Sequence, residues 1–141
     1  MKTTGVLTWY PVHPTSAYQN NTHVNGDNKG VAAYLLEQSL KTDANMAPGA
    51  IAAFSQSNVG DTSPNTLGAW CDDGSGQQCD FYTSTCPSDG KSQKCRGRGP
   101  AFRKLDLGIS SCYEIGRRQF AGARSLLVSN PGHHDSDKSQ D

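Results

Sequence analysis

The chain has 141 residues, and its 13 basic and 13 acidic side chains cancel to a formal net charge of zero. This balance argues against nucleic acid or an anionic membrane surface as a partner, because such binding requires clustered Lys and Arg. Hydrophobic residues make up only 34% of the chain, which also contains 15 Gly and 7 Pro. These values predict one loop-rich domain with limited helix and strand. The apolar runs are too short for a transmembrane segment.

The first predicted element is a strand from Gly5 to Val12, which is rich in β-branched and aromatic residues. Its alternating pattern places side chains on two faces: Val6, Thr8 and Tyr10 on one, Leu7 and Trp9 on the other. Pro11 and Pro14 end this strand and leave His13 at its exit.

A helix is predicted next, from Asn28 to Leu40, with Asp27 as its N-cap. Its expected buried stripe consists of Val31, Tyr34 and Leu35. A loop follows over residues 41–49. The run from Ala50 to Phe54 is short and entirely apolar, which predicts a buried central strand.

A last helix is predicted from Ile109 to Val128, ended by the turn residues 130–132. Spacings of three and four residues define its inward face: Ile109, Tyr113, Gly116, Phe120, Ala123 and Leu127. The pattern as a whole indicates a mixed α/β (α+β) fold over residues 1–129. Residues 130–141 are polar and predict a disordered tail.

Four of the five cysteines lie within 25 residues of chain: Cys71, Cys79, Cys86 and Cys95. The small polar residues around them bury little apolar surface, so cross-links are the expected source of order. Zinc is the alternative, but gaps of seven, six and eight residues differ from the close Cys pairs of structural zinc sites. We therefore expect disulfides, which cross-link this segment into a disulfide-stapled loop.

Disulfides place the protein in an oxidising compartment, so we expect it to be secreted or lumenal. Asn20 begins an Asn-X-Thr sequon and is a candidate glycosylation site. Residues 1–5, however, lead directly into the first strand without the apolar segment of a signal peptide. We therefore expect a parent protein whose true beginning is not in this chain.

The loop after the apolar run is the first candidate for chemistry, because α/β enzymes often place catalytic groups where a buried strand ends. Ser63 precedes a proline, which disfavours continuation as helix. A glycine and side-chain hydrogen bonds from Asx residues would hold such a loop in place. The candidate supporting residues are Asn58, Gly60, Asp61, Pro64 and Asn65. Composition alone favours an ordinary turn here, and the segment is not the GxSxG motif of α/β-hydrolases.

Histidines supply the other candidates. His13 is a possible metal ligand or base, although a lone histidine is more often a polar surface residue, since catalytic zinc takes three protein ligands. His23 is either a supporting residue or surface. The pair His133 and His134, with Asp135, resembles a ligand set but is expected to be solvated in the tail.

Six ordered segments resemble the neutral (non-lysosomal) ceramidase family, and together they span Gly5 to Leu127. The segments are WYPVHPTS (9–16), GDNKGVAAYLLEQ (26–38), AAFSQSNVGDTSPNTLGAWC (52–71), CDFYTSTC (79–86), CRGRGPAF (95–102) and IGRRQFAGA (115–123). The GDxSPN hexapeptide and the cysteine loop make this resemblance specific.

The resemblance implies a zinc-dependent N-acylsphingosine amidohydrolase that cleaves ceramide into sphingosine and a fatty acid. It assigns Ser63 as the essential serine and His13 as a zinc ligand. The expected partner is ceramide or another N-acylsphingoid lipid, and we expect contact with a membrane surface through this lipid substrate. It also implies two disulfides and one unpaired cysteine: Cys71–Cys86, Cys79–Cys95 and Cys112. The chain would be part of a larger catalytic domain.

An amide is a poor electrophile, and Ser63 would either attack its carbonyl or donate a hydrogen bond to the developing oxyanion. We favour the second role, because no general base accompanies Ser63 in the sequence. The family's other zinc ligands, a His, a Glu and a Tyr, come from segments that this chain does not contain. We therefore predict that the isolated polypeptide neither retains zinc nor hydrolyses ceramide. The alternatives are a secreted, disulfide-stapled binding module and a non-catalytic remnant.

Overall fold

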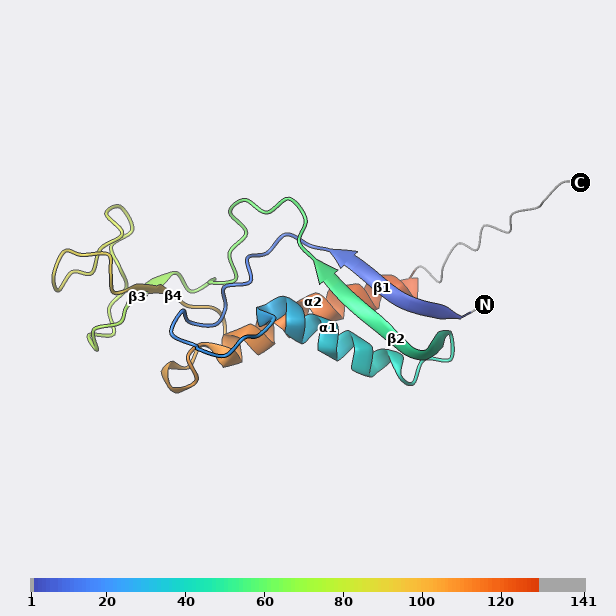
Figure 1. Ribbon diagram of the computed structural model, residues 1–141. Coiled ribbons are helices and arrows are strands. Elements are labelled where there is room, and N and C mark those ends of the chain that lie inside the picture. The colour runs from blue at the N-terminus through green and yellow to red at the C-terminus, as the bar shows by residue number, and fades with distance from the viewer. Residues whose placement is uncertain (1, 130–141) are drawn as a thin grey trace, which may run out of the picture.

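The computed structural model describes residues 2–129 and confirms a mixed α/β fold. Its elements are β1 (Thr3–Trp9), α1 (Asp27–Leu40), β2 (Met46–Ser55), β3 (Ala69–Cys71), β4 (Cys95–Gly97), a 3₁₀ helix (Lys104–Asp106) and α2 (Ile109–Ser129). Figure 1 shows two regions: β1, β2 and the two helices form a helix–sheet body, and residues 69–97 form a cystine lobe at its far end. No helix within residues 2–129 has the length and apolarity to cross a membrane. The predicted tail, with its histidine pair, lies outside the described residues.

β1 and β2 pair in parallel, with Gly5 opposite Ile51 and Trp9 opposite Ser55. The predicted alternation is confirmed, since Val6 and Thr8 are half-buried while Leu7 and Trp9 are exposed. The strand begins earlier than predicted and ends at Trp9 rather than Val12, and Tyr10 is half exposed. The Tyr10 N–H still donates to the Ser55 carbonyl oxygen at 3.2 Å, and the pairing stops after it because Pro11 has no N–H to donate.

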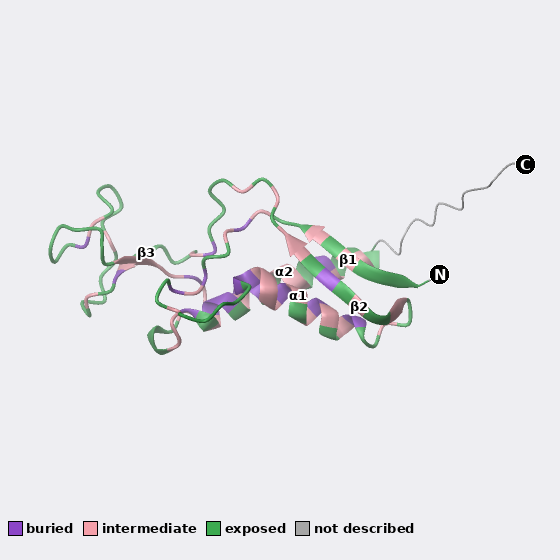
Figure 2. Cartoon of the chain, viewed as in Figure 1, coloured by how far each residue is buried: buried purple, intermediate pink, exposed green. Residues whose placement is uncertain are grey.

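The prediction of a buried central strand at Ala50–Phe54 was wrong in extent and burial. β2 begins at Met46, inside the predicted loop, and Ala52 is its one buried residue while Ile51 is 65% exposed. The pairing register shifts between Thr3, which lies opposite Met46, and Gly5, which lies opposite Ile51. The extra β2 residues between these two pairs include Gly49 at φ +77. β2 is paired with β1 alone within the described residues. Both helices cover the same face of this pair, so the other face is exposed (Figure 2).

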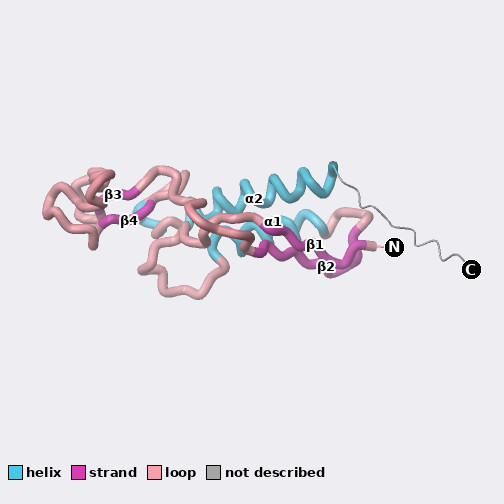
Figure 3. Tube along the Cα trace, turned by 90° about the horizontal axis from the view of Figure 1, so that it is seen from above, coloured by secondary structure: helices cyan, strands magenta, loops and turns pink. Residues whose placement is uncertain are grey.

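α1 was predicted correctly to within one residue, but its N-cap and its buried stripe were wrong. Gly26 is the N-cap, and Asp27 is the first helical residue, with a positive φ of 47. The buried apolar residues are Ala32, Leu36 and Leu40. The first two each follow a predicted residue by one position, and Leu40 was not predicted. They are shifted because α1 packs against both β2 and α2, which leaves Tyr34 58% exposed. Figure 3 shows both helices running along the body, with β3 and β4 beyond them.

The core joins Leu36 and Leu40 of α1 to Ala52 of β2 and Ala123 of α2. The predicted inward face of α2 is confirmed for its second half, where Phe120 and Leu127 pack against this core. Its first turns differ: Ile109 and Tyr113 are exposed, and three neighbours are buried instead: Ser111, Cys112 and Ile115. The buried face differs here because Ser111 lies against Gly99, and Gly116 lies against Val31 and Asn28 of α1.

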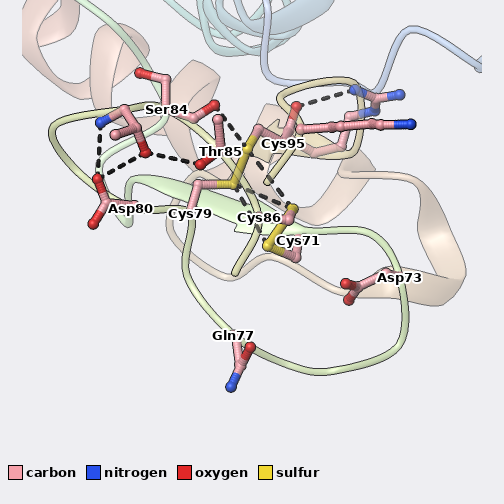
Figure 4. Close-up of a disulfide and its surroundings, with 12 residues drawn as sticks. Cys71, Asp73, Gln77, Cys79, Asp80, Ser84, Thr85, Cys86 and Cys95 are labelled. Carbon is pink, nitrogen blue, oxygen red and sulfur yellow. Dashed lines mark hydrogen bonds between the residues drawn. A yellow bond between two sulfur atoms is a disulfide. The ribbon is translucent and has the colours of Figure 1, made fainter. Parts of the chain in front are cut away.

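The cystine lobe contains the short antiparallel pair β3–β4, which the sequence did not predict. Both disulfides implied by the resemblance are confirmed, and Cys112 is free and buried. Figure 4 shows the two sulfur–sulfur bonds close together beside β3. The pairing excludes the zinc alternative for these four cysteines, because their sulfurs are occupied. Cys71 and Cys86 are the buried apolar residues of the lobe.

Candidate functional site

His13 and the loop that contains Ser63 lie side by side, although 50 residues separate them in the sequence. The backbone N–H of His13 donates to the carbonyl oxygen of Thr62 at 3.1 Å. Its ring Nε2 lies 2.9 Å from the carbonyl oxygen of Gly60. Two hydrogen bonds therefore join the exit of β1 to the loop that follows β2.

The contact with Gly60 selects one tautomer of the His13 ring. A carbonyl oxygen only accepts, so Nε2 carries the proton and donates it, and Nδ1 keeps its lone pair. Histidines that bind metals usually make this second hydrogen bond, which fixes the ring and increases the basicity of the ligating nitrogen. This hydrogen bond leaves the Nδ1 lone pair of His13 available to accept a proton or to bind a metal.

Ser63 is exposed and is held by backbone groups on either side of it. Its Oγ accepts the N–H of Asn65 at 3.1 Å, and its own N–H donates to the carbonyl oxygen of Asp61 at 3.1 Å. Asn58 and Asp61 are exposed, and within residues 2–129 no hydrogen bond is made by the side chain of either. The loop thus braces Ser63 through its backbone rather than through the Asp61 carboxylate.

Pro64 and Asn65 hold the same loop against residues 97–99, at the end of the cystine lobe and just beyond it. Pro64 is buried, and the carbonyl oxygen of this residue would lie 2.9 Å from a methyl group at Gly99. A methyl group at Gly97 would lie 2.5 Å from Asn65 Nδ2. Both glycines therefore permit close approach to the Ser63 loop. Sequence reasoning missed this role, although the CRGRGPAF segment contains both residues.

The start of α1 holds the exit of β1 through two buried side chains that sequence reasoning also missed. Asn28 Nδ2 donates to the carbonyl oxygen of His13 at 3.0 Å and to Ser16 Oγ at 2.9 Å. Gln119 of α2 donates to Asn28 Oδ1 at 2.9 Å. The Asp27 carboxylate accepts the N–H groups of residues 16 and 17 at 3.0 and 2.9 Å. The GDN triplet in the second matching segment was the available signal.

An apolar groove of about 670 Å³ borders Ser63. Its walls come from the end of the β1–β2 pair and from α2, and they include Trp9, Phe54, Ile115 and Leu126. Arg118 and Gln119 add polar groups on the α2 side. The arrangement combines an exposed hydroxyl with an adjoining surface that suits a hydrocarbon chain.

The other histidine among the described residues does not join this site. His23 is exposed, and its backbone N–H bonds locally to the Asn21 side chain. Over residues 2–129, the one cluster with the spacing of a metal site consists of three cysteines whose sulfurs are in disulfides. Within that range His13 is the one histidine that is hydrogen-bonded to the Ser63 loop. Asn20 is exposed and accessible to modification.

Residues 1–139 match the family described as "Neutral/alkaline non-lysosomal ceramidase, N-terminal". The chain belongs to this family. Neutral ceramidase B of Dictyostelium discoideum is 41% identical over 122 residues, which are 86% of this chain and 16% of that protein. Neutral ceramidase of Drosophila melanogaster is 43% identical over 126 residues, 87% of this chain and 17% of that protein. The chain thus spans about one-sixth of the length of these relatives.

A solved structure described as "Ceramidase complexed with C2" supports the fold. It matches with a TM-score of 0.53 at 29% identity and covers 86% of this chain and 14% of that chain. The resemblance stated from the six segments is thereby confirmed, and the mixed α/β ceramidase fold is present in this portion.

Proposed function

We propose that this chain contributes part of the active site of a ceramidase-type amide hydrolase. The reaction adds water across the N-acyl bond of ceramide: hydroxide goes to the acyl carbon to give a fatty acid, and a proton goes to nitrogen to give sphingosine. The observation that carries the proposal is the contact of His13 with the Ser63 loop in a chain of this family. The groove beside Ser63 provides an apolar surface for a lipid.

His13 fits zinc through Nδ1, because the Nε2–H group is donated to a carbonyl oxygen. Zinc, when bound, polarises an amide carbonyl and brings the pKa of a water molecule to about 7. A single imidazole does not complete a catalytic site, which takes three protein ligands. The proposal therefore requires further ligands from polypeptide other than residues 2–129.

Ser63 is assigned as a hydrogen-bond donor to the oxyanion of the tetrahedral intermediate. Its Oγ accepts the Asn65 N–H, so the hydroxyl proton is directed elsewhere and is free to be donated. Within residues 2–129 no His, Asp or Glu side chain is hydrogen-bonded to Ser63, so nothing there would remove its proton for a nucleophilic attack. A donor at this position needs no base.

The proposed compartment is extracellular or lumenal. Two disulfides in a lobe that buries little apolar surface support an oxidising environment. Exposure of Asn20 supports glycosylation of the Asn-X-Thr sequon there.

The purified chain alone is the first test. We expect zinc well below one ion per chain by elemental analysis, and no turnover of a fluorescent ceramide. One zinc per chain together with turnover would show that the described residues complete the site without other segments.

A chimera tests the assigned residues. The segment of Neutral ceramidase A of Dictyostelium discoideum that aligns with this chain, at 45% identity over 124 residues, is replaced by this chain's residues. We expect an active chimera in which His13→Ala loses zinc and activity, and Ser63→Ala lowers kcat by about 10²- to 10³-fold. Matched controls are His23→Ala and Ser57→Ala, which should retain activity.

Two outcomes would contradict the proposal. One is full activity in Ser63→Ala or His13→Ala, which would remove these residues from the chemistry. The other is an acyl-enzyme trapped on Ser63, which would make it the nucleophile. If ligand binding without hydrolysis persisted in Ser63→Ala, the binding-module alternative would be favoured instead.

A further inference from the structure

Two adjacent aromatic side chains project from the cystine lobe into solvent. Phe81 is 89% exposed and Tyr82 is 92% exposed. Their ring centroids lie 5.6 Å apart in an edge-to-face arrangement. We name this pair the aromatic tip. Most exposed apolar residues are scattered singly and need no explanation, but a neighbouring aromatic pair at this exposure is a concentrated apolar feature.

The turn that carries the aromatic tip is fixed at both ends by disulfides. Cys79, immediately before Asp80, is bonded to Cys95, and Cys86, immediately after Thr85, is bonded to Cys71. Figure 4 shows Asp80 and Thr85 beside these cystines. The Asp80 N–H also donates to the carbonyl oxygen of Thr85 at 2.8 Å. The rings are thus presented by a pre-organised turn, which lowers the entropy cost of binding.

Hydrogen bonds inside the turn leave few of its amides in need of water. Asp80 Oδ1 accepts the N–H groups of Tyr82 at 3.0 Å and Thr83 at 2.8 Å. The Ser84 N–H donates to the Asp80 carbonyl oxygen at 2.9 Å. Burying an unpaired amide away from water is costly, so a turn with satisfied amides enters a poorly hydrated layer more easily than an open one.

We propose that the aromatic tip docks the chain onto the interface of a zwitterionic phospholipid bilayer. Phe and Tyr suit the boundary between headgroups and acyl chains, where an apolar ring and a phenolic hydroxyl both find partners. This inference rests on the proposed function to the extent that a ceramide hydrolase must reach a lipid held in membranes.

The size and charge of the lobe favour this occupant. Two aromatic side chains bury roughly 150–250 Å² each, whereas a stable protein interface takes about 800 Å² per partner. Residues 69–97 contain four Asp against three Lys and Arg, so the lobe offers no attraction to anionic lipid. With a protein partner disfavoured by area and anionic lipid disfavoured by charge, we take zwitterionic lipid as the occupant.

The test is flotation of the oxidised chain with phosphatidylcholine vesicles that contain no ceramide. We expect the wild-type chain to float with the vesicles. Phe81→Ser combined with Tyr82→Ser should lower the partition coefficient at least tenfold, and Tyr82→Trp should raise it. The matched control, Tyr34→Ser with Tyr113→Ser, removes two exposed aromatic rings from the helices and should bind like wild type.

Equal binding by the tip variant and the wild type would overturn the proposal. So would the absence of vesicle binding by the wild type, or binding that requires phosphatidylserine and disappears in salt. Far-UV circular dichroism and a thiol count verify that each variant is folded and oxidised. Because the assay involves neither ceramide nor zinc, a negative result leaves the assignment of Ser63 and His13 intact.

Discussion

The helix–sheet body and the cystine lobe obtain their order from different sources. The body buries Leu36, Leu40, Ala52 and Ala123 in one apolar cluster. The lobe has disulfides where the body has a core, and turn carboxylates such as Asp80 hold its loops. The Ser63 loop connects the two regions, through the His13 contact on one side and the Asn65–Gly97 contact on the other. The candidate site thus depends on both sources of order.

The body also differs from the lobe in what it leaves uncovered. One face of the β1–β2 pair exposes Leu7, Trp9 and Ile51, and parallel sheets are normally covered on both faces. Neither strand has a charged side chain to discourage edge pairing. Because relatives are about six times longer, we propose that further segments of the domain cover this face in a complete ceramidase.

The largest effect should come from the core of the body. Leu36→Ala removes a fully buried side chain and should lower the free energy of unfolding by about 2–5 kcal/mol. Leu7→Ala, at a half-exposed position, is the control and should cost far less. Urea unfolding followed by circular dichroism measures both. Equal losses would mean that Leu7 is also part of a buried core.

Removing one disulfide should affect the lobe and spare the body. Cys71→Ser with Cys86→Ser opens a loop with a sequence separation of 15 and should cost about 3 kcal/mol of lobe stability. Hydrogen exchange should show faster exchange over residues 69–97 and unchanged protection in α1 and α2. Loss of protection in both regions would show that they unfold as one unit.

Two glycines of α2 differ in how closely other residues approach them. A methyl group at Gly116 would lie 2.6 Å from Val31 Cβ and 2.7 Å from the Asn28 carbonyl oxygen, so Gly116→Ala should cost about 1–3 kcal/mol. Gly122 has nothing within 4 Å, and Gly122→Ala should add up to about 1 kcal/mol through helix propensity. Thermal unfolding should shift in opposite directions for the two variants.

The last effect concerns the unpaired cysteine of the body and is confined to alkaline pH. Burial, with a lesser contribution from the Asp27 charge, raises the pKa of Cys112 to about 12. Between about pH 9 and 12 the unfolded chain therefore loses this proton while the folded chain keeps it. The free energy of unfolding should fall over this window by more in the wild type than in Cys112→Ala. Parallel pH profiles would contradict the assignment.

Sequence reasoning located the elements better than their faces. The apolar residues of α1 surround the helix, as VAAYLL shows, so periodicity alone did not distinguish Val31, Tyr34 and Leu35 from the residues that β2 and α2 bury. AIAAF is apolar throughout, which indicates a strand buried on both faces, whereas β2 has one covered face in this chain. Contacts between distant segments determine which residues of α1 are buried and which face of β2 is covered.

The candidate site was predicted where a motif named it. The roles of Ser63 and His13 came from the family resemblance and stay predictions. The disulfide pairing also came from it, because four cysteines allow three pairings, and the structure confirms that pairing. Asn28 and Gly97 were missed because their roles appear only when α1 meets the β1 exit and β4 meets the Ser63 loop. Local sequence rules do not contain such long-range contacts.

His13 and the Ser63 loop form one unit, held together by two hydrogen bonds. Nitrogen-15 NMR of the imidazole above pH 8 tests it most directly. We predict a single neutral tautomer with the proton on Nε2 and an unprotonated Nδ1, and a shift change at Gly60 and Thr62 in His13→Ala. A mixture of tautomers, with Gly60 and Thr62 unaffected by the substitution, would contradict this claim.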